Sequence, residues 1–262
     1  MFWHTYHPQA IIATVGTFSF RWYGLLIATA VLVGLVLTIY FFKKKQVDTT
    51  HVYNLFFLIV GFGLFGGRAG HIISEWEYYQ LHASELLKIW HGGLAIHGVL
   101  FGALLAVWMY ARWKKISFWL LIDLLVISLP LMQAIGRWGN YFNQELYGRP
   151  TSSPWGMPIS PPYREPGYES YAYFHPLFLY ESVLMLVIFG LMAWLFHKAK
   201  LRSGALAAVY FLLFAVVRFG LDFIRLHKLM IGALSETQWL SIIIFFLAGA
   251  GLWRIYRHDA IQ

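Results

Sequence analysis

The chain has 262 residues, of which 59% are hydrophobic and only 12% charged. Soluble domains carry about 25% charged residues, so a soluble globular protein is excluded. The formal charge is +8 and its basic residues lie in short clusters between apolar runs, which suits an anionic membrane better than nucleic acid. The absence of cysteine excludes disulfides, thiolate metal ligands and a cysteine nucleophile.

Seven apolar runs are long enough to cross a bilayer, which requires about 20 residues per helix. The sequence therefore predicts an all-α polytopic membrane protein with about seven transmembrane helices, forming a single integral membrane domain over residues 1–262. The predicted spans are 18–42, 52–73, 94–111, 117–135, 176–196, 204–224 and 237–254.

The basic clusters predict how the chain is oriented. Eleven of the 20 Lys and Arg residues lie in the short connections after spans one, three and five, or after span seven. By the positive-inside rule this side is cytoplasmic, so the amino terminus is expected outside and the carboxy terminus in the cytoplasm. The region 136–175 then lies outside, where its Pro and Gly content predicts turns. Segment 74–91, rich in Trp and Tyr, predicts an amphipathic helix on the outer surface.

Candidate functional residues begin in the first three spans. Tyr23, in FRWYG, is either an interfacial anchor or part of a site. Arg68, in GGRAG, lies near the end of an apolar span, where a charge marks a functional interior. His97, in HGGLAIHG, is either a satisfied core group or a proton acceptor, since imidazole can take up a proton near neutral pH. Gly98 and Gly102 have the small-xxx-small spacing of closely packed helices.

The stretch GRWGNYFNQELYGR at 136–149 has the composition of an anion site. Arg137 offers a fork of donors that matches phosphate geometry. Asn140 and Asn143 can donate and accept hydrogen bonds, and Glu145 can orient an arginine. The alternative is a polar turn that satisfies only its own backbone.

Charged residues recur in the fifth and sixth spans. Glu181, in HPLFLYE, can pair with an arginine. Arg218, Asp222 and Arg225 lie on one helix face, and one acid between two bases leaves a positive charge for an anionic ligand. The alternative is an ion pair that only fixes helix packing. HExxH, GxSxG, Walker-type and carboxylate-rich metal motifs are all absent from the sequence, so neither a metal nor a cofactor is expected.

With these motifs in view, GRWGNYFNQELYGR closely resembles GRxGNxxNxExxG, the signature of the prolipoprotein diacylglyceryl transferases. The resemblance covers nearly the whole chain, and it implies seven spans with the amino terminus outside. It also implies transfer of a diacylglyceryl group from phosphatidylglycerol to the lipobox cysteine thiol of a bacterial prolipoprotein, which yields a thioether and glycerol 1-phosphate. The further matching motifs are FRWYG, GGRAG, HGGLAIHG, HPLFLYE, RFGLDFIR and SETQWLS.

The resemblance implies roles for particular residues. Arg137 and Arg218 would engage the lipid phosphate, and His97 would be the base. Glu145 would support the arginines. The expected catalytic residues are His97, Arg137, Arg218, Tyr23 and Asn140. The expected substrate-binding residues are Arg137, Asn140, Asn143, Glu145, Gly148, Arg68, Arg218, Asp222, Arg225 and Glu181.

The implied partners are phosphatidylglycerol, the prolipoprotein and the lipid bilayer, with no nucleic acid. The implied location is the bacterial inner membrane, with the site toward the outer leaflet. Glycine-rich faces of spans two and three are candidates to line a gap for the acyl chains. Asp222 stands where the family usually has glutamate, which is expected to change its pairing with Arg218, and Phe178 replaces a polar residue. The competing class is a seven-span transporter or receptor with an anion pocket.

Overall fold

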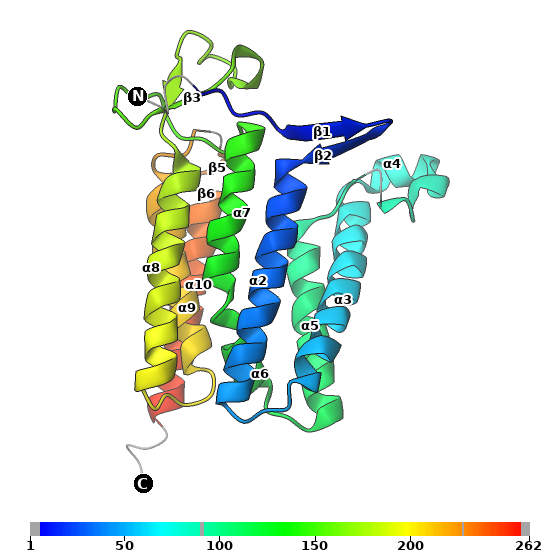
Figure 1. Cartoon of the computed structure of the whole chain (residues 1–262), viewed down its shortest axis with the longest axis vertical. Coiled ribbons are helices and arrows are strands. Elements are labelled where there is room, and N and C mark those ends of the chain that lie inside the picture. Colours follow the sequence, from blue (N-terminus) through cyan, green and yellow to red (C-terminus); the bar gives the residue numbers. More distant parts are fainter. Residues whose placement is uncertain (1–5, 90–91, 227, 258–262) are drawn as a thin grey trace. The chain divides into compact units, whose positions relative to one another are not determined.

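The computed structural model describes residues 6–89, 92–226 and 228–257 (Figure 1). The helices are α2 (Trp22–Lys44), α3 (Thr50–Ser74), α4 (Trp76–Leu81), α5 (Ile96–Lys114), α6 (Phe118–Val126), α7 (Leu129–Asn143), α8 (Leu177–Lys198), α9 (Ala205–Asp222) and α10 (Glu236–Arg257), with 3-10 turns η1 (Ala83–Glu85) and η3 (Pro161–Tyr163). Three antiparallel strand pairs complete the fold: β1 (Ile11–Val15) with β2 (Phe18–Arg21), β3 (Met157–Pro158) with β4 (Tyr173–Phe174), and β5 (Met230–Ile231) with β6 (Leu234–Ser235).

The predicted polytopic helical architecture is confirmed. Among the described residues, six helices are long and apolar enough to span a membrane: α2, α3, α5, α8, α9 and α10. The pair α6 and α7, bent by 44° at its break, counts as a seventh if it is one span.

The fourth predicted span differs most from the structure. Pro130 lies in the first turn of α7, where its missing N–H costs no intrahelical bond, so the helix restarts after the break. From there α7 continues to Asn143, and the prediction that the region from 136 forms only turns is wrong for 136–143. The helix ends at Gln144, whose φ of 53° is left-handed.

Two further predictions about local structure are wrong. The first span does not begin at 18, because β2 occupies Phe18–Arg21 and forms an exposed hairpin with β1. Nor is segment 74–91 one amphipathic helix, because α4 has only six residues and is followed by the single turn η1.

The chain divides into two compact units, Leu37–Leu124 and the remainder. Within Leu37–Leu124, α3 and α5 lie side by side (Figure 1). A Cβ at Gly66 or Gly98 would collide with the carbonyl oxygen of the other residue, and one at Gly102 would collide with that of Phe62. Close packing at Gly98 and Gly102 is therefore confirmed. The same contacts leave no space for an acyl chain between α3 and α5 at these glycines.

In the other unit, α7 packs on α8, and α9 packs on both α8 and α10. Ser182 of α8 donates to the carbonyl of Ala134 at 2.9 Å, and the hydroxyl of Tyr210 in α9 donates to Gln133 of α7 at 3.2 Å. These polar contacts fix three helices against one another.

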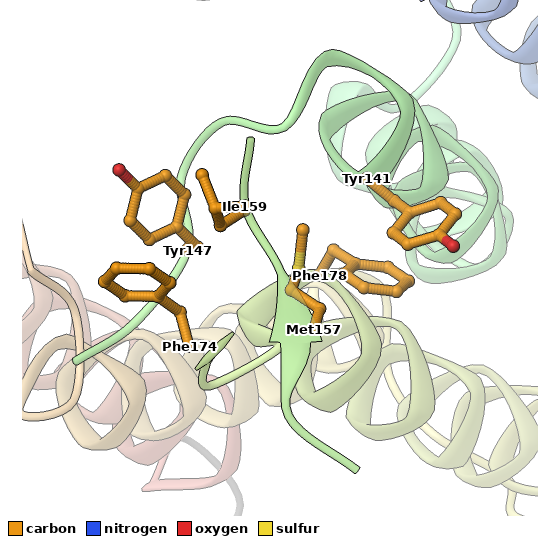
Figure 2. Packing of buried hydrophobic residues seen from close by; sticks show 6 residues of the cluster. All are labelled: Tyr141, Tyr147, Met157, Ile159, Phe174 and Phe178. Carbon is orange, nitrogen blue, oxygen red and sulfur yellow. The ribbon is translucent and has the colours of Figure 1, made fainter. Parts of the chain in front are cut away.

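A buried cluster attaches the loop between α7 and α8 to the ends of these helices. Figure 2 shows the rings of Tyr141 and Phe178 together, and those of Tyr147 and Phe174 together; each pair has centroids 4.7 Å apart. Burial of each large apolar side chain stabilises by roughly 1.5–3 kcal/mol. The loop is thus held where its residues approach α7 and α9. Met157 and Ile159 complete the cluster.

Candidate active site

Glu181 of α8 joins two arginines from two other helices. Its side chain is buried, with Oε1 at 2.6 Å from Nη2 of Arg137 in α7 and Oε2 at 3.1 Å from Nη1 of Arg218 in α9. A buried carboxylate is costly unless it is paired, so the three helices must meet at this distance. The expected pairing of Glu181 with an arginine is confirmed, and it involves both.

Arg137 is oriented by the end of its own helix. Its Nη1 donates to Oδ1 of Asn140 at 3.3 Å, one turn further along α7. Nδ2 of Asn140 in turn donates to Oε1 of Glu145 at 2.8 Å, and Nδ2 of Asn143 donates to the same oxygen at 3.2 Å. Glu145 therefore acts on Arg137 through Asn140.

Asp222 has different partners. Its buried carboxylate places Oδ1 at 3.7 Å from Nη1 of Arg225, and Oδ2 accepts a short hydrogen bond from the hydroxyl of Ser235. The backbone N–H of Gln238 donates to the hydroxyl of Ser235 at 3.1 Å and holds it in place. Arg218 thus forms its short ion pair with Glu181, while Asp222 connects the end of α9 to the start of α10.

These groups surround a small cavity of about 40 Å³ with partly apolar walls. The three arginines and two carboxylates that line it leave one positive charge in surplus. In a site of low dielectric such a surplus favours a singly charged anion, and a phosphodiester carries that charge. The lining residues are Arg137, Asn140, Leu146, Leu177, Phe178, Glu181, Arg218, Leu221, Asp222 and Arg225.

Gly148 lies outside this lining and positions the segment beside it. Its N–H donates to the carbonyl of His175, and a Cβ at this position would lie only 2.8 Å from that of His175 and 3.0 Å from the oxygen of Ile224. Gly148 also pairs with Arg225 as an antiparallel bridge. Because glycine has no side chain, the backbone at Gly148 can approach both the segment at His175 and the segment at Ile224 and Arg225.

Tyr23 lies at the start of α2 with its ring against Gly139 of α7, where a Cβ would collide with it. It lines an open groove together with Arg21 and Asn143, separate from the arginine cavity.

The remaining two expected site residues belong to the Leu37–Leu124 unit. Arg68 is buried, and within the described part of the chain it donates to backbone carbonyls: Nε to Leu86 at 2.8 Å, Nη1 to Gly92 at 2.8 Å and to Gly93 at 3.2 Å, and Nη2 to Glu85 in a short bond.

His97 lies exposed in the first turn of α5, with no hydrogen-bond partner for its imidazole among the residues that the structure describes. His91 of the same motif is outside the described residues.

Some residues at or beside the site were given no role from the sequence. Ser235 and Gln238 lie in the matching motif SETQWLS at the start of an apolar span, and this motif was the signal that could have indicated them. Leu146 carries no such signal. It lines the cavity with a φ of 54°, a left-handed conformation unusual for a side chain of this size.

The fold and this site together define a polytopic helical membrane protein in which two arginines from different helices pair with one buried carboxylate. A family model described as prolipoprotein diacylglyceryl transferase matches residues 10–254. The chain belongs to this family, so the competing class of a transporter or receptor is not supported.

Several curated relatives carry the same activity in their names. The phosphatidylglycerol–prolipoprotein diacylglyceryl transferase of Trichormus variabilis is 40% identical, over 95% of this chain and 90% of its own length. The protein of the same name from Fervidobacterium nodosum is 42% identical, over 94% of this chain and 84% of its own length. The protein of the same name from Gloeobacter violaceus is 38% identical, over 97% of this chain and 96% of its own length.

Proposed function

We propose that this chain transfers the diacylglyceryl group of phosphatidylglycerol to the lipobox cysteine thiol of bacterial prolipoproteins, the first step of lipoprotein maturation. The observation that carries the proposal is that Arg137 and Arg218 both pair with the buried carboxylate of Glu181, in a chain of this family. The names of the relatives support the same donor and acceptor.

The reaction is a displacement at carbon. The acceptor sulfur forms a bond to the terminal carbon of the diacylglyceryl group, and the bond from that carbon to the phosphate oxygen breaks. The electron pair stays on the phosphate, which changes from a singly charged diester to a more highly charged monoester and leaves as glycerol 1-phosphate. Arg137 and Arg218 stabilise this developing charge in a site already short of negative charge.

The thiol must lose its proton during the attack. A free cysteine has a pKa of about 8.5, so a positioned base raises its reactive fraction. His97 is the proposed base. Because the chain contains no cysteine, the acceptor thiol belongs to the substrate, and the scheme is a direct transfer without an enzyme-bound thioether.

We place the site toward the outer leaflet of the bacterial inner membrane. Basic residues end α2, α5, α8 and α10. Glu181 lies near the opposite end of α8 from Lys198, so the positive-inside rule favours an outward site. The proposed enzyme is a single integral membrane domain that meets both substrates at the membrane.

The test is incubation of purified protein with phosphatidylglycerol and a lipobox peptide, followed by mass spectrometry. A thioether-linked diacylglyceryl peptide is expected. Removal of one donor from a charge-stabilising site costs about 10²–10³ in rate, so Arg137→Ala and Arg218→Ala should lose transfer by that factor while inserting normally. Near-wild-type turnover in either variant contradicts the phosphate clamp, and binding of the lipid without product contradicts the enzyme.

The role of His97 is tested separately with His97→Asn, which keeps a polar side chain of similar size but cannot take up the proton. We expect loss of most turnover, measured as kcat across pH 6 to 9. Substantial retained activity with an unchanged pH profile would limit His97 to a positioning role.

A further inference from the structure

A second cavity, of about 390 Å³, adjoins the arginine cavity. Leu146 and Arg225 line both, so the two cavities are immediate neighbours. The second cavity is formed by the end of β2, the turn after α7 and the loop before α8. Its principal polar side chains are Arg21, Asn143, Glu145, Tyr147, Glu165 and Arg225.

The charges in this second cavity balance. Arg21 and Arg225 supply two positive charges, and Glu145 and Glu165 supply two negative ones. The hydroxyl of Tyr147 donates to the carbonyl of Tyr163 and accepts from the N–H of Glu165, both at 2.7 Å. Burial raises the pKa of the Tyr147 phenol, so it stays neutral. The cavity therefore lacks the positive surplus of its neighbour, and it suits an uncharged polar group better than another anion.

Two side chains that line the second cavity carry hydrogen-bond acceptors that remain available. Oε1 of Glu145 accepts from both Asn140 and Asn143, whereas Oε2 has no partner among the described residues. The buried Oδ1 of Asn143 likewise accepts no hydrogen bond within the part of the chain that the structure describes. A ligand hydroxyl would satisfy the buried Asn143 oxygen, since buried polar atoms without partners are uncommon. A second hydroxyl can donate to Oε2 of Glu145, which lies on an exposed residue.

We infer that the second cavity receives the terminal glycerol of the phosphatidylglycerol headgroup while the phosphate lies between Arg137 and Arg218. This inference rests on the proposed function. Beyond its phosphate the donor carries a three-carbon group with two free hydroxyls and no charge. The cavity has room for roughly a dozen waters at about 30 Å³ each, which is ample for that group.

The geometry gives Glu145 a coupling role. One of its oxygens holds Asn140, which holds Arg137, and the other is available to a headgroup hydroxyl. Recognition of the glycerol thus stabilises the arginine that binds the phosphate. Asn143 contributes to headgroup selectivity from the same turn of helix α7.

The experiment pairs a protein variant with a lipid variant. Transfer from dioleoyl phosphatidylglycerol is compared with that from dioleoyl phosphatidylmethanol, which has the phosphodiester but no headgroup hydroxyls; if the latter is not turned over, its Ki as a competitor is measured. One neutral hydrogen bond corresponds to about three- to tenfold. Asn143→Ala should lose that factor in kcat/KM for phosphatidylglycerol, and Arg21→Ala, which removes a charged donor, should lose at least as much. Both variants should change little toward phosphatidylmethanol. Arg149→Ala, an exposed arginine that lines neither cavity, is the charge-matched control for Arg21.

Each other result overturns the inference. An equal loss for both lipids means that the side chains act on the phosphate or the fold. No loss for either lipid means that the cavity is not used, and a change confined to the KM of the peptide assigns it to the acceptor. These three outcomes leave the proposed function intact. Absence of product from the unmodified protein with phosphatidylglycerol overturns the proposed function together with the subsite.

Discussion

Glu181 determines the geometry of the two arginines because it is the carboxylate that both of them share. Each of its oxygens faces a different guanidinium, and its side chain is 5% exposed, so solvent does little to screen the charge of the carboxylate. Without the carboxylate, two neighbouring guanidiniums repel and no longer converge on one ligand.

Replacement of Glu181 by Gln should therefore lower kcat by about 10²-fold, the effect expected when charge stabilisation at the transition state is lost. The amide preserves the shape but removes the negative charge and directs an N–H₂ group at one guanidinium. The measurement is transfer by purified protein under saturating phosphatidylglycerol. Glu169→Gln is the control, since Glu169 is exposed and its carboxylate accepts the backbone N–H of Gly167 away from the arginines. Equal activity of the two variants would contradict the bridging role.

The turn after α7 contains two residues in a strained backbone conformation, and this conformation positions Glu145. Gln144 and Leu146 have φ of 53° and 54°, on either side of Glu145. A left-handed residue other than glycine costs roughly 1–2 kcal/mol, so the surroundings must hold it. Gln144 supplies that restraint: it donates to the carbonyl of Pro8 at 2.8 Å and accepts the N–H of Ser160 at 2.7 Å. The turn thereby directs Glu145 back toward Asn140.

At the scale of elements, Arg68 connects α3 to the segment that follows it. Its guanidinium lies 5.1 Å from the ring of Tyr79 in α4, and its donors reach four carbonyls between Glu85 and Gly93. Charge-assisted bonds of this kind are the stronger ones in proteins. The contacts explain why an arginine is retained near the end of an apolar helix, without requiring a ligand.

Arg68→Ala should release the segment between α4 and α5. It leaves four carbonyls without their donor, and each hydrogen bond to a charged group contributes about 1.5–3 kcal/mol. We expect limited proteolysis within residues 75–93 to become at least tenfold faster in detergent or nanodiscs. Lys88→Ala is the matched control, because the ion pair of Lys88 with Glu85 is partly exposed and such pairs contribute about 0–1 kcal/mol. Unchanged proteolysis with lost lipid binding would instead make Arg68 a substrate-binding residue.

At the scale of the whole molecule, the absence of cysteine makes the proposed orientation directly testable. Two separate variants, Ser152→Cys and Lys45→Cys, each introduce one exposed cysteine for labelling. The first lies in the loop before α8 and the second directly after α2. A membrane-impermeant maleimide should label Ser152→Cys in spheroplasts and Lys45→Cys only after permeabilisation, because basic connections remain cytoplasmic. The unmodified chain provides the background. The reverse pattern would place the active site on the cytoplasmic side.

The spans were predictable because crossing the hydrocarbon core of a bilayer imposes a length and an apolar composition that no other structure requires. The interior positions of the arginines were predictable for the same reason, because a charge inside an apolar span is costly unless it is paired or faces water. The β1–β2 hairpin was not, because Phe18–Arg21 leads into an apolar span and hydropathy does not separate a short strand from a helix. The helical form of 136–143 was missed because its glycines and polar groups resemble a loop.

By itself, the sequence determined the class of protein, the approximate spans and the motif that contains Arg137, Asn140 and Glu145. Only the tertiary structure decided which charges meet. Arg218 lies four residues from Asp222 on one helix face, yet its short ion pair is with Glu181, 37 residues away. The physical reason is that the partner of a buried charge is the group that helix packing brings within about 3 Å, and that distance depends on how α7, α8 and α9 fit together rather than on spacing along any one of them.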